Sequence, residues 1–145
     1  MTIEKLSPHN LQQLLTLVLE LWTDCSLEEE TPYYTALMNA PDELCLLAKE
    51  GDHYVGFLHL STRKDYVEGA DELPIAYIEG IYVQPHHQHK GIARRLVSAG
   101  EEWARQMGLK QLASDTEWNN TSSIAFHQQI GFHEAGRIVC FIKSL

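Results

Sequence analysis

The segment from residue 81 to residue 96, IYVQPHHQHKGIARRL, combines residue types that could bind an anion or a metal ion. His86, His87 and His89 could suggest zinc, but side chains this close together in one loop rarely converge on one ion. No cysteine or aspartate pair completes a shell of four ligands. We therefore favour a basic loop that binds phosphate, and we expect no metal.

The elements on either side of this segment indicate how it would bind phosphate. Residues 75–83 are nearly all apolar and predict a central strand, and apolar residues recur at helical spacing after Gly91. The first N–H groups of a helix have no intrahelical partner, and the helix dipole adds partial positive charge there. A glycine lets a phosphate approach the backbone. The patterns GxxxxGK[ST] and GxGxxG are absent, which argues against a Walker loop and a dinucleotide fingerprint.

Glu79 is the second residue that suggests chemistry, because it is a carboxylate inside an apolar strand. Such a group is costly to bury unless it is paired or hydrated. A carboxylate at this position could accept a proton from an amine, directly or through water, or bind the amine as a cation. We favour either of these roles over a structural ion pair.

Charge and length narrow the class of protein. The net charge is −9, from 11 basic and 20 acidic residues, which argues against nucleic acid and favours cationic partners or simple solubility. Acidic residues cluster in the segments 24–30 and 64–74. The 145 residues predict a single domain, 1–145. We expect no membrane span and no signal peptide, and therefore a cytoplasmic protein.

The apolar periodicity and the turn signals predict a mixed sheet flanked by helices, an α/β architecture. The predicted elements are a strand at 2–6, a helix at 8–21, a helix at 31–39, a hairpin around Gly51 and Asp52, a strand at 75–83, a helix from 91 that ends at Gly108, a strand at 110–115, a helix from about 120 to 129, and one or two strands in 131–145.

The six residues from Gln88 through His89, Lys90, Gly91 and Ile92 to Ala93 fit the pattern Q/R-x-x-G-x-G/A. At the end of an apolar strand and the start of a helix, this pattern resembles the coenzyme A loop of the GCN5-related N-acetyltransferase (GNAT) superfamily. The resemblance covers nearly the whole chain. It implies a mixed, mostly antiparallel sheet of six to seven strands, about four helices, and acetyl-CoA as co-substrate.

The same resemblance implies residues that bind acetyl-CoA. The backbone of Ile81, Tyr82 and Val83 would hold the pantetheine arm like an added strand, and the N–H groups from His89 to Arg94 would hold the pyrophosphate. Asn120 would reach the pantetheine, although it could also be a helix cap alone. We further hypothesise that Lys90 pairs with the ribose 3′-phosphate.

A histidine stands where the family often has a tyrosine, four residues before the glycine of the "GF" pair at 131–132. In the family this tyrosine gives a proton to the departing thiolate. His127 could deliver a proton near neutral pH. The alternative is a helix residue that is half-buried against the sheet.

The sequence also resembles a narrower family, the short chromosomal-type aminoglycoside 6′-N-acetyltransferases. Members bind the drug through residues that match Trp22, Tyr66, Glu79 and Asp115, and some carry a late acid where this chain has Gly136. Glu134 lies nearby and becomes the candidate for that contact. Trp22 could equally be a core residue.

The resemblance implies direct transfer in a ternary complex and a homodimer. The predicted function is therefore acetyl-CoA-dependent N-acetylation of the 6′-amine of an aminoglycoside. Two alternatives stay open: acetylation of another amine, such as a polyamine or a protein amino group, and a non-catalytic acyl-CoA sensor.

Overall fold

The computed structural model describes residues 1–145 and contains one sheet and four α-helices. The elements run in the order β1 (Thr2–Lys5), α1 (Leu11–Leu21), α2 (Leu27–Leu37), β2 (Glu43–Glu50), β3 (His53–Arg63), β4 (Ile75–Val83), a 3₁₀ turn (Pro85–His87), α3 (Ile92–Gln106), β5 (Leu112–Ala113) and α4 (Thr121–Gln129). The strand order is β1-β2-β3-β4-β5. All neighbours are antiparallel except β4 and β5, which are parallel. The predicted α/β architecture is confirmed.

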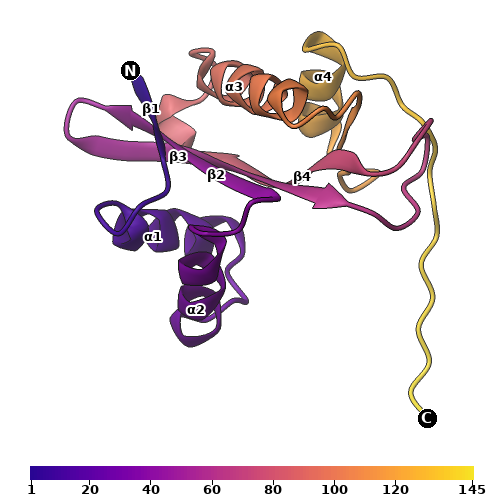
Figure 1. Cartoon of the computed structure of the whole chain (residues 1–145), viewed down its shortest axis with the longest axis horizontal. Helices are drawn as coiled ribbons and strands as arrows, with labels where there is room; N and C mark the ends of the chain where they lie inside the picture. Colours follow the sequence, from indigo (N-terminus) through magenta and orange to yellow (C-terminus); the bar gives the residue numbers. More distant parts are fainter.

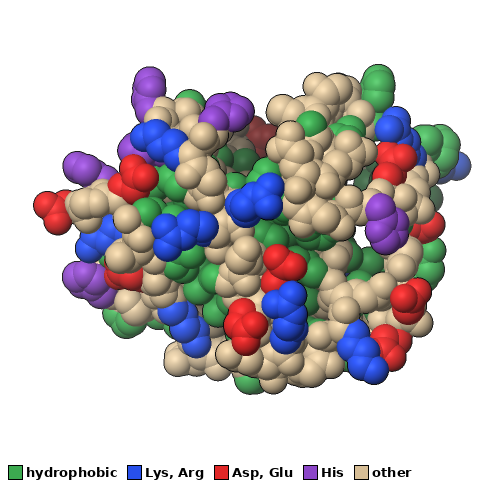
Figure 2. Space-filling view, turned by 90° about the horizontal axis from the view of Figure 1, so that it is seen from above, with side chains coloured by type: hydrophobic (Ala, Val, Ile, Leu, Met, Phe, Trp, Pro, Cys, Tyr) green, Lys and Arg blue, Asp and Glu red, His purple; other side chains and the backbone are tan.

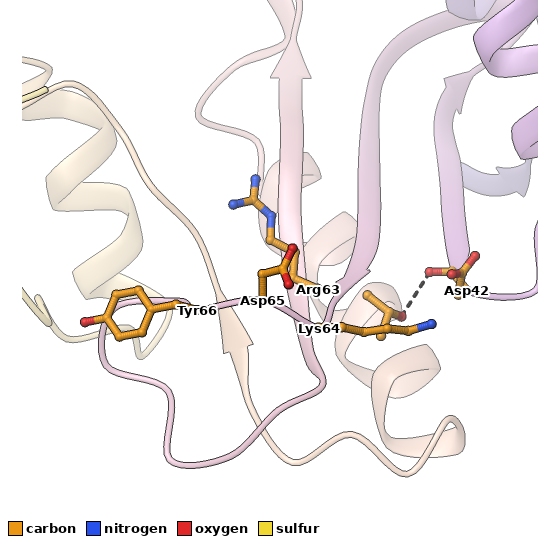
Figure 3. A pocket seen from close by; sticks show the side chains of 6 residues that line it. Asp42, Arg63, Lys64, Asp65 and Tyr66 are labelled. Atoms are coloured by element: carbon orange, nitrogen blue, oxygen red, sulfur yellow. Dashed lines mark hydrogen bonds between the residues drawn. The ribbon is translucent and has the colours of Figure 1, made fainter. Parts of the chain in front are cut away.

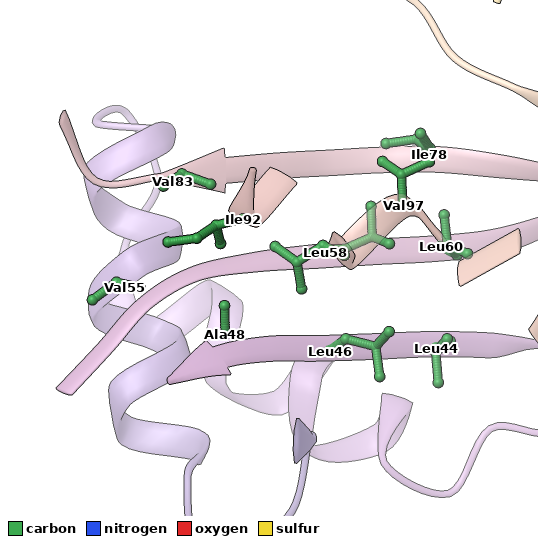
Figure 4. Close-up of a cluster of buried hydrophobic side chains, with 11 residues drawn as sticks. Leu44, Leu46, Ala48, Val55, Leu58, Leu60, Ile78, Val83, Ile92 and Val97 are labelled. Carbon is green, nitrogen blue, oxygen red and sulfur yellow. The ribbon is translucent and has the colours of Figure 1, made fainter. Parts of the chain in front are cut away.

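The sheet separates two helical layers, with α1 and α2 on one face and α3 and α4 on the other (Figure 1). Each layer buries its own apolar cluster. Leu58, Leu60 and Val97 belong to the cluster under α3 (Figure 4), while Val18 and Phe57 belong to the cluster under α1 and α2. Adjacent residues of a strand point to opposite faces, so Phe57 and Leu58 serve different layers. None of the four helices has both the length and the apolar character that a membrane crossing requires.

The starts of the first two helices differ from the prediction. The side chain of Asn10 accepts from the Ser7 N–H at 2.9 Å and donates to the Lys5 carbonyl, so residues 7–10 form a turn and α1 begins at Leu11. Helix α2 begins at Leu27, because the Ser26 hydroxyl caps it by accepting from the Glu29 N–H at 3.2 Å. Pro32, which was predicted to begin this helix, lies inside it.

The prediction of one or two strands in residues 131–145 is wrong, and the sheet therefore has five strands instead of six to seven. No backbone hydrogen bond involves residues 133–145. Ala135 and Gly136 lie beside Gly69 and Glu68, and the chain then extends away from the body of the molecule as the yellow segment in Figure 1. This segment includes Phe141 and Ile142, which are 92% and 100% exposed. The apolar alternation is that of a strand, but the segment pairs with no strand of this chain.

Strand β4 has two irregular features, an unpaired edge and a β-bulge. Residues 78 to 83 pair with β3 on one side, but β5 pairs only with Ala76 and Tyr77, which leaves the other edge of β4 open over its second half. Glu79 is the extra residue of a β-bulge, because His59 pairs with Gly80 and Leu60 pairs with Ile78. A bulge re-aims a side chain, and bulges are common beside active sites.

Candidate functional site

The loop between β4 and α3 ends in a set of free backbone donors. Gly91 is the N-cap of α3 with φ of 81°, and His89 also has a positive φ of 63°. The first backbone hydrogen bond of the helix runs from the Arg95 N–H to the Gly91 carbonyl at 3.1 Å. The three N–H groups before it, from Ile92 to Arg94, therefore have no intrahelical acceptor. A Cβ built on Gly91 would meet no atom within 4 Å, so the space in front of the helix is open.

The side chains of this loop are secondary to its backbone. His87 contacts Glu50 at 2.9 Å, and Gln88 donates to the Val83 carbonyl at 3.0 Å, which holds the loop against the end of β4. Lys90 is exposed. Most of the histidine side chains on the face that carries α3 and α4 gather at one end of it, while lysine and arginine side chains are spread across the face (Figure 2). No group of three or more metal-binding side chains occurs in the molecule.

Asn120 is the N-cap of α4, and its carbonyl oxygen accepts from the Ser123 N–H at 3.2 Å. The predicted role of Asn120 as a helix cap is therefore confirmed. The amide nitrogen of the same side chain has no protein partner and is exposed. The residue can thus cap the helix and still offer a donor to a ligand.

His127 is a half-buried residue of α4, and its ring contacts Ser114 just after β5. Its Nδ1 is 2.7 Å from the Ser123 carbonyl, an acceptor, so the neutral ring carries its proton on Nδ1. Nε2 then accepts from the Ser114 hydroxyl at 2.8 Å. A protonated ring would donate to both partners, and the Ser114 hydroxyl would then be free to donate elsewhere.

A hollow of about 480 Å³ lies beside Glu79 and is rich in acids and aromatic rings. Its lining comes from the end of α1, from α2 and from the sheet: Trp22, Cys25, Glu29, Glu30, Tyr33, Tyr34, His59 and Glu79. Both acids on α2 come from the acidic segment 24–30. The hollow has no lysine or arginine in its lining.

Trp22 closes this hollow against β4. A Cβ built on Gly80 would lie 2.5 Å from Cη2 and 2.9 Å from Cζ2 of Trp22, so the indole lies directly over the glycine. The ring also meets Phe57 edge to face, with centroids 6.1 Å apart. Trp22 is therefore a packing residue that also forms part of the wall of the hollow.

Glu79 forms the ion pair that the sequence interpretation disfavoured. Arg63 donates from Nε to Oε1 and from Nη2 to Oε2, both at 2.9 Å, and the Ser61 hydroxyl donates to Oε1 at 2.6 Å. Partial burial alone would raise the pKa of Glu79, but the bonds from Arg63 and Ser61 outweigh it and hold the pKa below its ordinary value. Glu79 is thus a stable carboxylate and a weak base. The pairing register of β3 with β4, which brings Arg63 next to Glu79, was not predicted from the sequence.

Asp115 belongs to the same network through a tyrosine. The Tyr77 hydroxyl donates to Asp115, and the Arg63 guanidinium lies over the Tyr77 ring at 3.5 Å from its centroid. Arg63 therefore stands between two of the acids that were predicted to bind substrate.

Tyr66 and Glu134 lie away from the Trp22 hollow. Tyr66 is exposed and lines a second hollow of about 460 Å³ with Arg63, Lys64 and Asp65 (Figure 3). Glu134 is exposed and pairs with Arg137 at 2.7 Å. Arg63 connects the two hollows. It lines the Tyr66 hollow, and it forms an ion pair with Glu79, which lines the Trp22 hollow.

Sequence reasoning missed a polar cluster at the floor of the Trp22 hollow. Glu43 accepts from the Tyr33 hydroxyl at 2.8 Å and contacts His59 Nε2 at 3.1 Å. Burial lowers the pKa of His59 below its ordinary value, against the opposing effect of Glu43. The one available signal was a histidine inside the apolar strand 55–60.

Comparisons with a family model and with known proteins bear on the family of the chain. The acetyltransferase (GNAT) family model matches residues 11–132. An aminoglycoside N(6′)-acetyltransferase type 1 of Serratia marcescens is 35% identical over 137 residues, covering 94% of each chain. The protein of the same description from Acinetobacter baumannii is 36% identical over 146 residues, covering 100% of this chain and 99% of the relative.

Among solved structures, AAC(6′)-Iy in complex with the bisubstrate analogue CoA-S-monomethyl-acetylneamine matches with a TM-score of 0.95 and 29% identity, over 99% of this chain and 98% of that one. The resemblance predicted from the segment 88–93 is thereby confirmed. The match of the family model over most of the chain and the identity to these relatives show that the chain belongs to the GNAT acetyltransferase family.

Proposed function

We propose that this protein transfers the acetyl group of acetyl-CoA to the 6′-amine of an aminoglycoside, by direct attack of the amine in a ternary complex. One observation carries the proposal: the free donors of α3 and the open edge of β4 lead to Glu79, which stands at the wall of an acidic, aromatic hollow. The similarity to aminoglycoside N(6′)-acetyltransferases supports the same reaction.

The chain offers a matching surface for acetyl-CoA. The N–H groups from His89 to Arg94 would bind the pyrophosphate at the start of α3, where Gly91 leaves room for it. Ile81, Tyr82 and Val83 would pair with the amides of the pantetheine arm along the open edge of β4. The free amide nitrogen of Asn120 would donate to the same arm, and Lys90 would meet the 3′-phosphate. Acetyl-CoA supplies the thioester that an amine attacks.

The acceptor side suits a molecule with several ammonium groups and sugar rings. Glu29, Glu30 and Glu79 offer carboxylates, and Trp22 and Tyr66 offer flat faces to rings and cations. Asp115 is linked to Glu79 through Tyr77 and Arg63. We assign Glu134 as a contact to the part of the substrate that is farthest from Glu79. A polycationic aminoglycoside fits this chemistry better than a neutral acceptor.

We assign the two proton steps to different groups. The amine would give up its proton on the Glu79 side, to water or to the one acceptor position that Oε2 retains. The thiolate would receive a proton from protonated His127 through the Ser114 hydroxyl. Replacing Ser114 by alanine should lower kcat and leave both KM values unchanged. A normal kcat in this variant would remove Ser114 from the reaction.

The test of the function is an assay of free thiol released from acetyl-CoA in the presence of kanamycin. We expect release that depends on both substrates, and a large loss of kcat/KM for kanamycin in Glu79→Gln. No release with several aminoglycosides would refute the proposal, and release with a polyamine instead would identify another amine as the acceptor. Binding of acetyl-CoA without turnover of any amine would indicate a sensor.

We propose that the protein is a homodimer. The support comes from residues 133–145, where Ile138, Val139, Phe141 and Ile142 are exposed and no backbone group is paired. An extended apolar segment of this kind adds readily to the edge of a sheet in a second copy. Sedimentation should give a dimer for the natural chain and a monomer for Phe141→Asp. A monomeric natural chain would refute the proposal.

We also propose that the protein acts in the cytoplasm. Its three cysteines, Cys25, Cys45 and Cys140, form no disulfide, which is the usual state of thiols in a reducing compartment. Recovery of the activity from the periplasmic fraction of a producing cell would contradict this assignment.

A further inference from the structure

The pair of Arg63 and Glu79 is held from several sides. The guanidinium meets the carboxylate with two bonds of 2.9 Å, and this two-point geometry is one that a lysine cannot reproduce. The Tyr77 ring supports the guanidinium from one side at 3.5 Å. Figure 3 shows the Arg63 side chain pointing away from Lys64 and Tyr66. Both of these guanidinium bonds therefore go to Glu79, and the residue at the same time lines the hollow of Tyr66.

A bare carboxylate at this position would conflict with the reaction. An amine must be neutral to attack a thioester, whereas an alkylamine near neutral pH is mostly protonated. A carboxylate within about 4–6 Å of an ammonium group favours the charged form and shifts its pKa upward by about one to three units. An unpaired Glu79 would therefore bind the acceptor tightly, but in its unreactive form.

We propose that Arg63 is a positioning residue that acts through Glu79: it cancels the charge of this carboxylate, so that the acceptor amine is oriented at Glu79 without being held there as an ammonium ion. This inference rests on the proposed N-acetylation. The bonding supports it, because Oε1 of Glu79 takes two donors while Oε2 takes one. A carboxylate oxygen has two lone pairs, so Oε2 keeps one position that can accept an N–H of the amine.

Other titratable groups face this pair, and none of them replaces the arginine charge. From the sheet, from α2 and from the segments after α1 and β5 they are His59, Tyr77, Glu43, Tyr33, Tyr34, Glu29, Glu30, Cys25 and Asp115. Burial lowers the pKa of His59, which leaves this ring neutral near neutral pH, and burial together with Asp115 raises the pKa of Tyr77. The remaining groups are carboxylic acids, neutral phenols or a neutral thiol. Arg63 is thus the one fixed cation that contacts Glu79.

The size of the effect follows from the exposure of the pair. The side chains are 40% and 27% exposed for Arg63 and Glu79, so solvent screens part of the interaction. We therefore take the lower end of the range for a neighbouring charge, about one pKa unit. Loss of Arg63 should then decrease the neutral fraction of the bound amine about tenfold near neutral pH.

The test measures kcat and KM for kanamycin from acidic to alkaline pH in the natural protein and in Arg63→Gln, which removes the charge and can keep one bond to Glu79. We expect KM for kanamycin to fall, kcat near neutral pH to fall about tenfold, and the pH profile of kcat to shift about one unit toward alkaline pH, where kcat recovers. KM for acetyl-CoA should not change. Arg105→Met, an equal loss of charge on the exposed surface of α3, should leave the profile where it is.

Arg63→Lys provides a second measurement, because it keeps the charge and loses the two-point geometry. We expect its pH profile to match that of the natural protein, even if KM for kanamycin changes. A profile that does not shift in Arg63→Gln, or a rise in KM with a loss of kcat at every pH, would overturn the inference while the function stands. Absence of turnover in the natural protein would refute the proposed function, and the inference with it.

Discussion

The contact of Trp22 with Gly80 leads to a quantitative prediction for Gly80→Ala. The new Cβ would lie 2.5 Å from Cη2 of the indole, whereas carbon atoms rest about 3.5 Å apart, so the ring must retreat by about 1 Å. Overpacking of this kind costs about 1–3 kcal/mol in a closed core. Because the ring is half-buried and a hollow lies beside it, we expect about 1 kcal/mol and a decrease in Tm of about 3 °C.

The same displacement should impair catalysis on the acceptor side. An error of about 1 Å in positioning can cost about 100-fold in rate, so kcat/KM for kanamycin should fall between about tenfold and 100-fold. We expect a much smaller change in KM for acetyl-CoA, because the new Cβ clashes with the Trp22 ring and the loop before α3 lies on other elements. Thiol release with each substrate varied in turn separates the two effects, and thermal unfolding gives the stability.

A compensating change makes this prediction specific. Trp22→Phe removes the outer ring atoms that meet the new Cβ, so the double variant Gly80→Ala with Trp22→Phe should be more stable than the sum of the two single effects predicts. We expect a coupling of about 1 kcal/mol in the double-mutant cycle. Strictly additive effects would show that the indole does not lie over Gly80, and the proposed wall of the acceptor hollow would be wrong.

Three further predictions concern other parts of the site. Gly91→Val should raise KM for acetyl-CoA about tenfold and leave KM for kanamycin unchanged, because a branched residue is strained at a φ of 81°; equal changes in both constants would contradict this. Asn120→Ala should cost about 1 kcal/mol of stability through the lost cap, whereas Asn120→Asp should keep the cap and still raise KM for acetyl-CoA. Glu79 has a pKa below its ordinary 4.5 in the folded protein, so its contribution to stability is present above about pH 4.5 and is lost as the pH falls through the lower folded value. The unfolding free energy of Glu79→Gln should therefore fall less steeply below pH 4.5 than that of the natural protein, and parallel curves would contradict the assignment.

Local signals made the loop before α3 predictable from the sequence. An apolar strand, a glycine and a helical repeat occur within about 30 residues, and each follows from short-range physical rules that do not depend on the rest of the fold. The cap at Asn120 and the end of α3 at Gly108 are of the same kind. The start of α2 also has a local signal, since Ser26 with Glu29 forms the S-x-x-E signature, whereas the prediction placed this start at residue 31.

Long-range pairings were the part that the sequence could not reveal. The partner of Glu79 is 16 residues away and depends on the register of β3 against β4, and a bulge at Glu79 changes this register by one residue. The role of residues 133–145 depends on what lies beside the free edge of the sheet, and strand-like alternation alone does not supply a neighbour.

The most direct test of the account uses two aminoglycosides that differ only at the 6′ position. Neomycin carries an amine there, and paromomycin carries a hydroxyl group. We predict thiol release from acetyl-CoA with neomycin and none with paromomycin, together with one added acetyl group on the neomycin 6′-nitrogen. Equal release with both drugs would mean that another amine is acetylated, and would contradict the central claim that the 6′-amine is the one that reacts beside Glu79.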